Sequence, residues 1–124
     1  MLDTHVLIWA ANGALDSKAT LKSTLAAIKD IDNDLCFSSA AVWEIVIKSE
    51  RINVDPERLC SGLVARGYRE IPITTAHALE AAKLPDIHKD PFDRIMLAQA
   101  RLEGICLVTC DKVVLKYQEG VLEF

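Results

Sequence analysis

The chain has 124 residues, the size of a single domain over residues 1–124, and 51% of them are hydrophobic, enough for a substantial core. Its formal net charge of −4 argues against a general basic surface for nucleic acid, but not against a site whose metal ions carry the positive charge. The sequence contains no signal peptide and no apolar run long enough to span a bilayer. Four cysteines without the paired spacing of zinc ligands favour free thiols in a reducing cytoplasm.

Short apolar strands alternate with helical patterns along the chain. In the first half, the pattern predicts a strand end at 1–2, helices over 3–13 and 16–29, a strand over 35–37, and helices from 38–39 and over 55–67. In the second half, it predicts a strand over 69–73, a helix from 74–75 to 83, a loop over 84–89, a helix over 90–104, a strand over 105–108, a helical turn over 113–117 and a last strand at 121–122. This alternation predicts an α/β fold with a mostly parallel sheet covered on both faces.

The helix predicted over residues 90–104 begins with Asp90-Pro91, a capping acceptor followed by a proline at the first helical position. Gly104 ends it. Asp93 falls in the first turn, where the helix dipole favours a carboxylate. A capping role explains Asp93 in isolation, yet Asp55-Pro56 opens another helix with Arg58 at the corresponding position. A cap therefore does not require this second aspartate.

In a parallel sheet the functional cleft lies beyond the carboxyl ends of the strands. Asp3 follows the first strand and Asp111 follows the fourth. Asp93 lies in the first turn of the helix that precedes the fourth strand. Glu44 is a charge within a largely apolar helix. Taken singly, each acid has an ordinary explanation: an N-cap for Asp3, a solvated helix face for Glu44 and a turn for Asp111.

Taken together, the four carboxylates of Asp3, Glu44, Asp93 and Asp111 indicate a site. On one cleft they would repel and raise one another's pKa unless a cation neutralised them. An all-oxygen donor set suits Mg²⁺ or Mn²⁺ better than zinc, and the corresponding chemistry is phosphodiester hydrolysis. Side chains expected to support the acids, or a water between them, are Thr4, Ser39, Arg94 and Thr109.

Four motifs carry a family resemblance: Leu2-Asp-Thr-His-Val-Leu-Ile-Trp9, Ser38-Ser-Ala-Ala-Val-Trp-Glu-Ile45, Asp90-Pro-Phe-Asp-Arg94 and Val108-Thr-Cys-Asp111. They resemble the PIN-domain ribonucleases, and most closely the VapC toxins of toxin–antitoxin pairs. The resemblance implies a three-layer α/β/α fold with a five-stranded sheet, and metal-dependent endoribonuclease activity on RNA. The family's acids map onto Asp3, Glu44, Asp93 and Asp111, and Asp90 remains a cap.

The same resemblance implies a homodimer inhibited by a cognate antitoxin whose tail lies across the cleft. The family usually has several apolar residues before its first aspartate, whereas only Met1 and Leu2 precede Asp3 here, so a first strand is marginal. Basic residues near the motifs are candidates for contacts with RNA phosphates, with Lys48 and Lys112 preferred (Lys48, Arg51, Lys89, Arg94, Lys112, Lys116).

The three histidines show no metal-ligand spacing, and we expect structural roles for His5, His77 and His88. At helical spacing His5 should point about 200° away from Asp3, and in strand geometry Cys110 should face away from Asp111. Two other functions remain open. A catalytically silent binding module of the same fold has no need for four acids in this pattern. A receiver-type phosphoacceptor domain requires paired acids after the first strand, where Asp3 stands alone.

Overall fold

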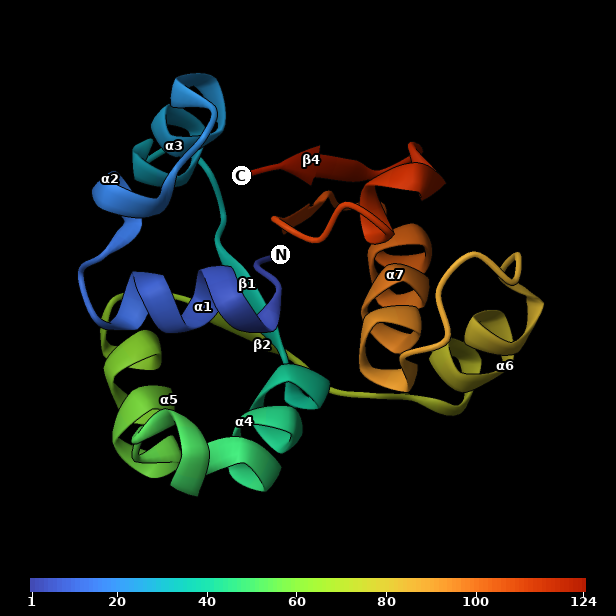
Figure 1. Ribbon diagram of the computed structural model, residues 1–124, viewed down its shortest axis with the longest axis horizontal. Helices are drawn as coiled ribbons and strands as arrows, with labels where there is room; N and C mark the ends of the chain where they lie inside the picture. The colour runs from blue at the N-terminus through green and yellow to red at the C-terminus, as the bar shows by residue number, and fades with distance from the viewer.

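The computed structural model describes residues 1–124, and its helices and strands alternate along the whole chain (Figure 1). The first half contains α1 (Thr4–Ala11), α2 (Leu15–Lys18), α3 (Lys22–Lys29), β1 (Cys36–Ser38), α4 (Ser39–Ile52) and α5 (Pro56–Ala65). The second half contains β2 (Arg69–Ile71), α6 (Thr75–Lys83), α7 (Pro91–Glu103), β3 (Leu107–Thr109), the 3₁₀-helix η1 (Val114–Tyr117) and β4 (Val121–Glu123). None of the helices has the length and apolar character that crossing a membrane requires.

Two parallel strand pairs form the centre of the molecule, β1 with β2 and β3 with β4. Leu2 joins them, because it makes isolated parallel bridges to Phe37 of β1 and to Val108 of β3. Its N–H donates to the carbonyl of Cys36 at 3.0 Å, and the N–H of Asp3 donates to the carbonyl of Val108 at 2.9 Å. The predicted α/β fold with parallel strands is therefore confirmed. The structure contains four strands of three residues each, and Leu2 alone occupies the position between the two pairs.

The helix starts follow the predicted capping residues. Asp55 accepts from the N–H groups of Glu57 and Arg58, and Asp90 accepts from the N–H of Phe92 at 2.8 Å. Thr74 and His77 form a reciprocal capping box at the start of α6. The strand predicted over 69–73 ends at Ile71, because Pro72 has no N–H with which to continue the ladder.

The prediction of one helix over residues 16–29 is wrong. The segment breaks between α2 and α3, and α2 begins after Ala14 with no side-chain cap from Asp16. Tertiary contacts explain the break: the hydroxyl of Thr20 donates to the carbonyl of Phe124, and that of Thr24 to the carbonyl of Glu123 at 2.7 Å. These bonds hold the segment against the end of β4. They cannot be predicted from helix propensity, which depends on neighbouring residues alone.

The helices fall into two groups that meet at the strands (Figure 1). Helices α1, α4 and α5 pack against one another, and α6 packs against α7. The core between them is made of fully buried apolar side chains, including Leu2, Phe37, Ile45, Leu97 and Leu107. Because α4 also contacts α7, the starts of α1, α4 and α7 come close to the ends of β1 and β3.

The position of Leu2 gives the first testable prediction. Its side chain is 0% exposed and its backbone joins both strand pairs, so Leu2→Ala should lower the free energy of unfolding by about 2–5 kcal/mol. The matched control is Leu79→Ala on α6, where the leucine is 61% exposed and the change should be within about 0.5 kcal/mol. Urea unfolding measures both. Equal effects in the two variants would contradict the central role of Leu2.

Candidate metal centre

Asp3 lies where the chain leaves the strand position and enters α1. It is the N-cap of α1, and its Oδ1 accepts from the N–H of Val6 at 2.7 Å. Its Oδ2 accepts from the hydroxyl of Thr109 at the end of β3. The side chain is 4% exposed, and this burial raises its pKa although both hydrogen bonds lower it. The capping role and a role in the site are therefore compatible, because one carboxylate performs both.

Glu44 is buried, at 6% exposure, although three large apolar neighbours on the same helix are exposed (Trp43, Val46, Ile47). A solvated helix face for Glu44 is therefore ruled out. Its carboxylate accepts hydrogen bonds from the hydroxyl of Thr4 and from the ammonium of Lys48, one turn further along α4. The bond to Glu44 raises the pKa of Lys48, which keeps this lysine charged. A buried charge that is paired in this way is typical of a functional position.

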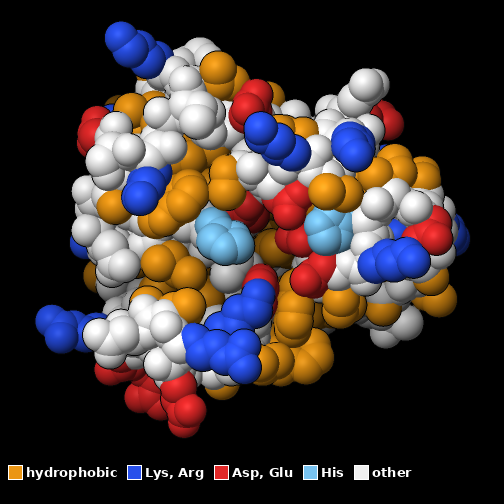
Figure 2. All heavy atoms as spheres, in the orientation of Figure 1, with side chains coloured by type: hydrophobic (Ala, Val, Ile, Leu, Met, Phe, Trp, Pro, Cys, Tyr) orange, Lys and Arg blue, Asp and Glu red, His pale blue; other side chains and the backbone are white.

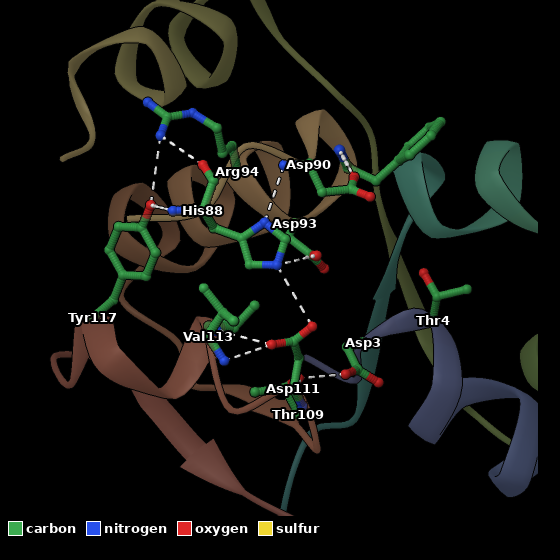
Figure 3. Close-up of polar contacts among 12 residues, drawn as sticks. Asp3, Thr4, His88, Asp90, Asp93, Arg94, Thr109, Asp111, Val113 and Tyr117 are labelled. Carbon is green, nitrogen blue, oxygen red and sulfur yellow. Dashed lines mark hydrogen bonds and ion pairs between the residues drawn. The ribbon is translucent and has the colours of Figure 1, made fainter. Parts of the chain in front are cut away.

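Asp93 and Asp111 both approach the same ring nitrogen of His88 (Figure 3). The Nε2 of His88 lies 3.3 Å from Asp93 Oδ2 and 3.5 Å from Asp111 Oδ2. Its Nδ1 accepts from the N–H of Asp90 at 3.0 Å, so the proton of the neutral ring is on Nε2. Asp111 also accepts from the N–H groups of Val113 at 2.6 Å and Val114 at 3.3 Å, at the start of η1.

The four predicted carboxylates share one pocket of about 130 Å³. On the face in Figure 2, acidic side chains gather in a hollow with histidine side chains beside it. Nine residues line the pocket, none of them hydrophobic: Asp3, Thr4, His5, Glu44, Lys48, His88, Asp90, Asp93 and Asp111. Asp90, predicted to be only a cap, also lines this pocket, because its carboxylate binds the start of α7 beside Asp93.

The charges in this pocket are not balanced at Asp93. Burial raises its pKa to about 7, and repulsion from Asp90, Glu44 and Asp111 adds to the effect against the opposing influence of His88. For Asp111, burial favours the neutral form, but the N–H groups of Val113 and Val114, together with His88, outweigh it and leave the pKa below its usual value. Asp93 is thus the carboxyl group of this pocket whose ionised form is most disfavoured by its surroundings.

The residues present fit a hard divalent cation. Four carboxylates lie around a small polar pocket, and oxygen ligands are those that Mg²⁺ and Mn²⁺ prefer. The pKa of Asp93, raised first by burial and then by the neighbouring carboxylates, would fall beside such a cation.

The predicted supporting residues behave differently from one another. Thr109 donates to Asp3 and accepts from the N–H of Asp111 at 2.9 Å, so it connects two of the acids. Thr4 donates to Glu44. Ser39 contacts none of the acids, because its Oγ accepts from the N–H of Ile73 at 3.2 Å. The expected direct bond from Ser39 to the acids is therefore wrong, and its bond to a water between them stays a prediction.

Arg94 was also expected to support the acids, and it does not. Its guanidinium donates to backbone carbonyls at the end of α6 and in the loop before α7, at distances from 2.9 to 3.0 Å (Ala81, Leu84, Pro85, His88). The hydroxyl of Tyr117 donates to Pro85 and accepts from the N–H of His88 at 3.0 Å (Figure 3). Arg94 therefore holds the loop that presents His88, on the side away from the carboxylates.

The histidine predictions need correction for two of the three residues. His77 is structural as predicted, in the capping box of α6 and 3.2 Å from Glu103. His88 instead lies between two of the acids. The sequence signal for it was weak: a histidine two residues before a capping aspartate, whose ring can bind that residue's N–H.

The expected orientation of His5 away from Asp3 is wrong. A ring nitrogen of His5 and the sulfur of Cys110 lie within 4.8 Å of each other and of a carboxylate oxygen of Asp3. The expectation that Cys110 faces away from Asp111 stays a prediction. Asp3 has extended backbone angles (φ −68°, ψ 173°), so helical periodicity does not extend back from His5 to it. Strand geometry ends with β3 at Thr109, so alternation does not fix the direction of Cys110. Of the two preferred lysines, Lys48 lines the pocket, whereas Lys112 is exposed outside it.

The comparisons with known proteins agree with this arrangement. The PIN domain family model matches residues 1–119. The chain belongs to the PIN domain family. No curated protein sequence matches it.

Two solved structures have the same fold as this PIN domain. One is a toxin–antitoxin complex from Klebsiella pneumoniae, at 19% identity and a TM-score of 0.67, with 98% of this chain and 93% of that chain covered. The other is VapBC2 from Rickettsia felis bound to a DNA fragment from its promoter, at 17% identity and a TM-score of 0.69, with 100% and 96% covered. At these identities the likeness concerns the fold.

The unbalanced charge at Asp93 gives the second prediction. Its folded pKa of about 7 lies above the value of 3.8 for an ordinary aspartate, so the folded protein binds this proton more tightly than the unfolded chain does. In EDTA the free energy of unfolding should therefore fall as the pH rises from about 4 to about 7, and Asp93 should change it no further above that. Asp93→Asn should raise the melting temperature, and by more at pH 8 than at pH 5.

The matched control is Asp86→Asn, which removes an exposed charge outside the pocket. Thermal unfolding of wild type and both variants in EDTA at the two pH values makes the comparison. A gain for Asp93→Asn that is the same at pH 5 and pH 8, or is matched by Asp86→Asn, would show that the carboxylates do not strain the folded state.

Proposed function

We propose that this PIN domain is a metal-dependent endoribonuclease that hydrolyses RNA phosphodiester bonds, and that it is the toxin of a VapBC-type toxin–antitoxin pair. The observation that carries the proposal is the convergence of four carboxylates from α1, α4, α7 and the end of β3 on one polar pocket. A binding module would gain nothing from such mutual repulsion. The toxin–antitoxin complexes among its structural neighbours support the second part of the proposal.

The four acids share one role in this proposal. Asp3, Glu44, Asp93 and Asp111 would hold Mg²⁺ or Mn²⁺. When bound, such an ion lowers the pKa of an attacking water and stabilises charge on the leaving oxygen. Without a cation the pKa of Asp93 is about 7, so binding of the ion near neutral pH would displace the proton of this carboxyl group.

Lys48 is the preferred contact for the phosphate of RNA. Its side chain is 46% exposed at the edge of the pocket while its ammonium pairs with Glu44, so it can reach the substrate without losing its position. Lys112, next in sequence to Asp111, is proposed as a second and more distant contact with the RNA backbone. Both contacts would weaken with salt, because they neutralise phosphate charges.

We further propose a homodimer in the cytoplasm, inhibited by a cognate antitoxin. Trp43 (59% exposed), Val46 (51%) and Ile47 (60%) form an apolar patch on α4, the helix that carries Glu44. Trp43 packs edge-on against Phe92 of α7, with ring centroids 5.0 Å apart, so this patch continues to the start of the helix that carries Asp93. Apolar side chains grouped on an otherwise charged surface favour a protein partner beside the pocket.

Cleavage of RNA by the purified protein tests the proposal. With Mg²⁺ or Mn²⁺ the wild type should cut a mixture of cellular RNAs internally, and EDTA should abolish the activity. Glu44→Gln should lower the rate by more than about 100-fold, since loss of even an outer-shell partner of a metal costs about 10–100-fold. The matched control is Glu50→Gln, an exposed glutamate on the same helix, which should keep the wild-type rate.

Several outcomes would contradict the proposal. Full activity in EDTA would remove the metal, and equal rates for Glu44→Gln and wild type would remove Glu44 from the site. RNA binding without cleavage under every metal condition would favour a silent binding module. Stable incorporation of phosphate on an aspartate from a small phosphodonor would favour a receiver-type domain.

A further inference from the structure

Asp3, His5 and Cys110 make a second group of possible ligands beside the four carboxylates. One atom from each, a carboxylate oxygen, a ring nitrogen and the thiol sulfur, lies within 4.8 Å of the other two. Asp3 is buried, His5 is exposed on the first turn of α1, and Cys110 is half-buried just beyond β3. From these residues we propose that the chain binds a divalent cation of the zinc class, and that this binding withdraws Asp3 from the carboxylate site.

The fold holds two of these residues in place without any metal. Asp3 caps α1 with one oxygen and accepts from Thr109 with the other. Cys110 directly follows Thr109, so the bond that fixes Asp3 also fixes the backbone that carries the thiol. The exposed ring of His5 is free to rotate toward them. The group is therefore preorganised from two elements that are far apart in sequence, and one flexible side chain completes it.

The donor atoms select the metal. Nitrogen and sulfur together are the ligands that Zn²⁺ prefers, with Zn–S about 2.3 Å and Zn–N about 2.0–2.1 Å, and a site with three protein ligands leaves a fourth position open. Mg²⁺ and Mn²⁺ favour oxygen and have little use for a thiol. Atoms within 4.8 Å of one another come into this range by small side-chain rotations. Asp3 and His5 also line the polar pocket, so the fourth position would be open to solvent on that side.

The two sites cannot both be complete, because Asp3 belongs to each. A cation held by His5 and Cys110 occupies the lone pairs of the Asp3 carboxylate that the site of Glu44, Asp93 and Asp111 would otherwise use. It also brings positive charge beside the 130 Å³ pocket that Asp3 and His5 line, and this charge opposes a second cation there. Zinc should therefore inhibit cleavage that Mg²⁺ or Mn²⁺ supports. This consequence rests on the proposed function, whereas the binding itself does not.

Cobalt is the probe for the binding, because Co²⁺ takes zinc sites and is coloured. With its thiols kept reduced, the metal-free wild type titrated with Co²⁺ should develop a thiolate-to-cobalt charge-transfer band in the near ultraviolet, and Zn²⁺ should bleach it. Cys110→Ser should lose this band, and His5→Asn should weaken Co²⁺ binding at least tenfold. The matched control is Cys106→Ser, which removes an exposed thiol outside the group and should keep the band.

No band in the wild type, or a band that survives Cys110→Ser, would overturn the site whatever the protein's enzymatic activity. The inhibition is measured separately. In a cleavage assay with Mn²⁺, with each variant normalised to its own rate without zinc, the zinc concentration that halves the rate should rise at least tenfold in Cys110→Ser and stay the same in Cys106→Ser.

Equal sensitivity in the two variants would overturn the coupling through Asp3. A wild type that is inactive in Mn²⁺ would count against the proposed nuclease, and the cobalt spectrum would still decide the site.

Discussion

The bridge made by Leu2 and Asp3 is the constraint on which the rest of the structure depends. Two backbone residues join the strand pairs, with Leu2 between Phe37 and Val108 and the N–H of Asp3 on the carbonyl of Val108. The same two residues fix the start of α1, because Asp3 caps it, and they align β3 with it through Thr109. Leu2 is fully buried, so the apolar core stabilises the position of the first carboxylate. The position of Asp3 in the site is thus set by the same backbone hydrogen bonds that join the strands.

The other acids are held by local partners of unequal strength. Glu44 has the hydroxyl of Thr4 and the ammonium of Lys48, and Asp111 has two backbone N–H groups. Asp93 has only His88 at 3.3 Å, and its raised pKa comes first from burial and then from the carboxylates around it. The backbone fixes these charges close together before any cation is present, and their repulsion destabilises the metal-free protein. A bound cation relieves this repulsion and so stabilises the folded state.

Sequence reasoning succeeded where the cause was local. Capping by Asp55, Asp90 and Thr74 follows from a few adjacent residues, and so does the alternation of strands with helices. It failed where distant partners decided the outcome. The predicted helix over 16–29 breaks because Thr20 and Thr24 bind the end of β4. Arg94 was predicted to support the acids, yet it donates to backbone carbonyls of Ala81 and Pro85, which the tertiary fold places beside it. His5 was misplaced because helical periodicity was extended back beyond the start of α1, and His88 was missed because no metal-ligand spacing marks it.

The central claim is that the clustered carboxylates require a cation. The most direct test of this claim is to measure the protons released when a cation binds. Calorimetry of Mn²⁺ binding in buffers of different ionisation enthalpy gives the number of protons released per ion. With a pKa of about 7 for Asp93, wild type should release about one proton near pH 6 and almost none near pH 9. Asp93→Asn should release much less at the lower pH. Binding without proton release at pH 6, or the same release from Asp93→Asn, would contradict the account.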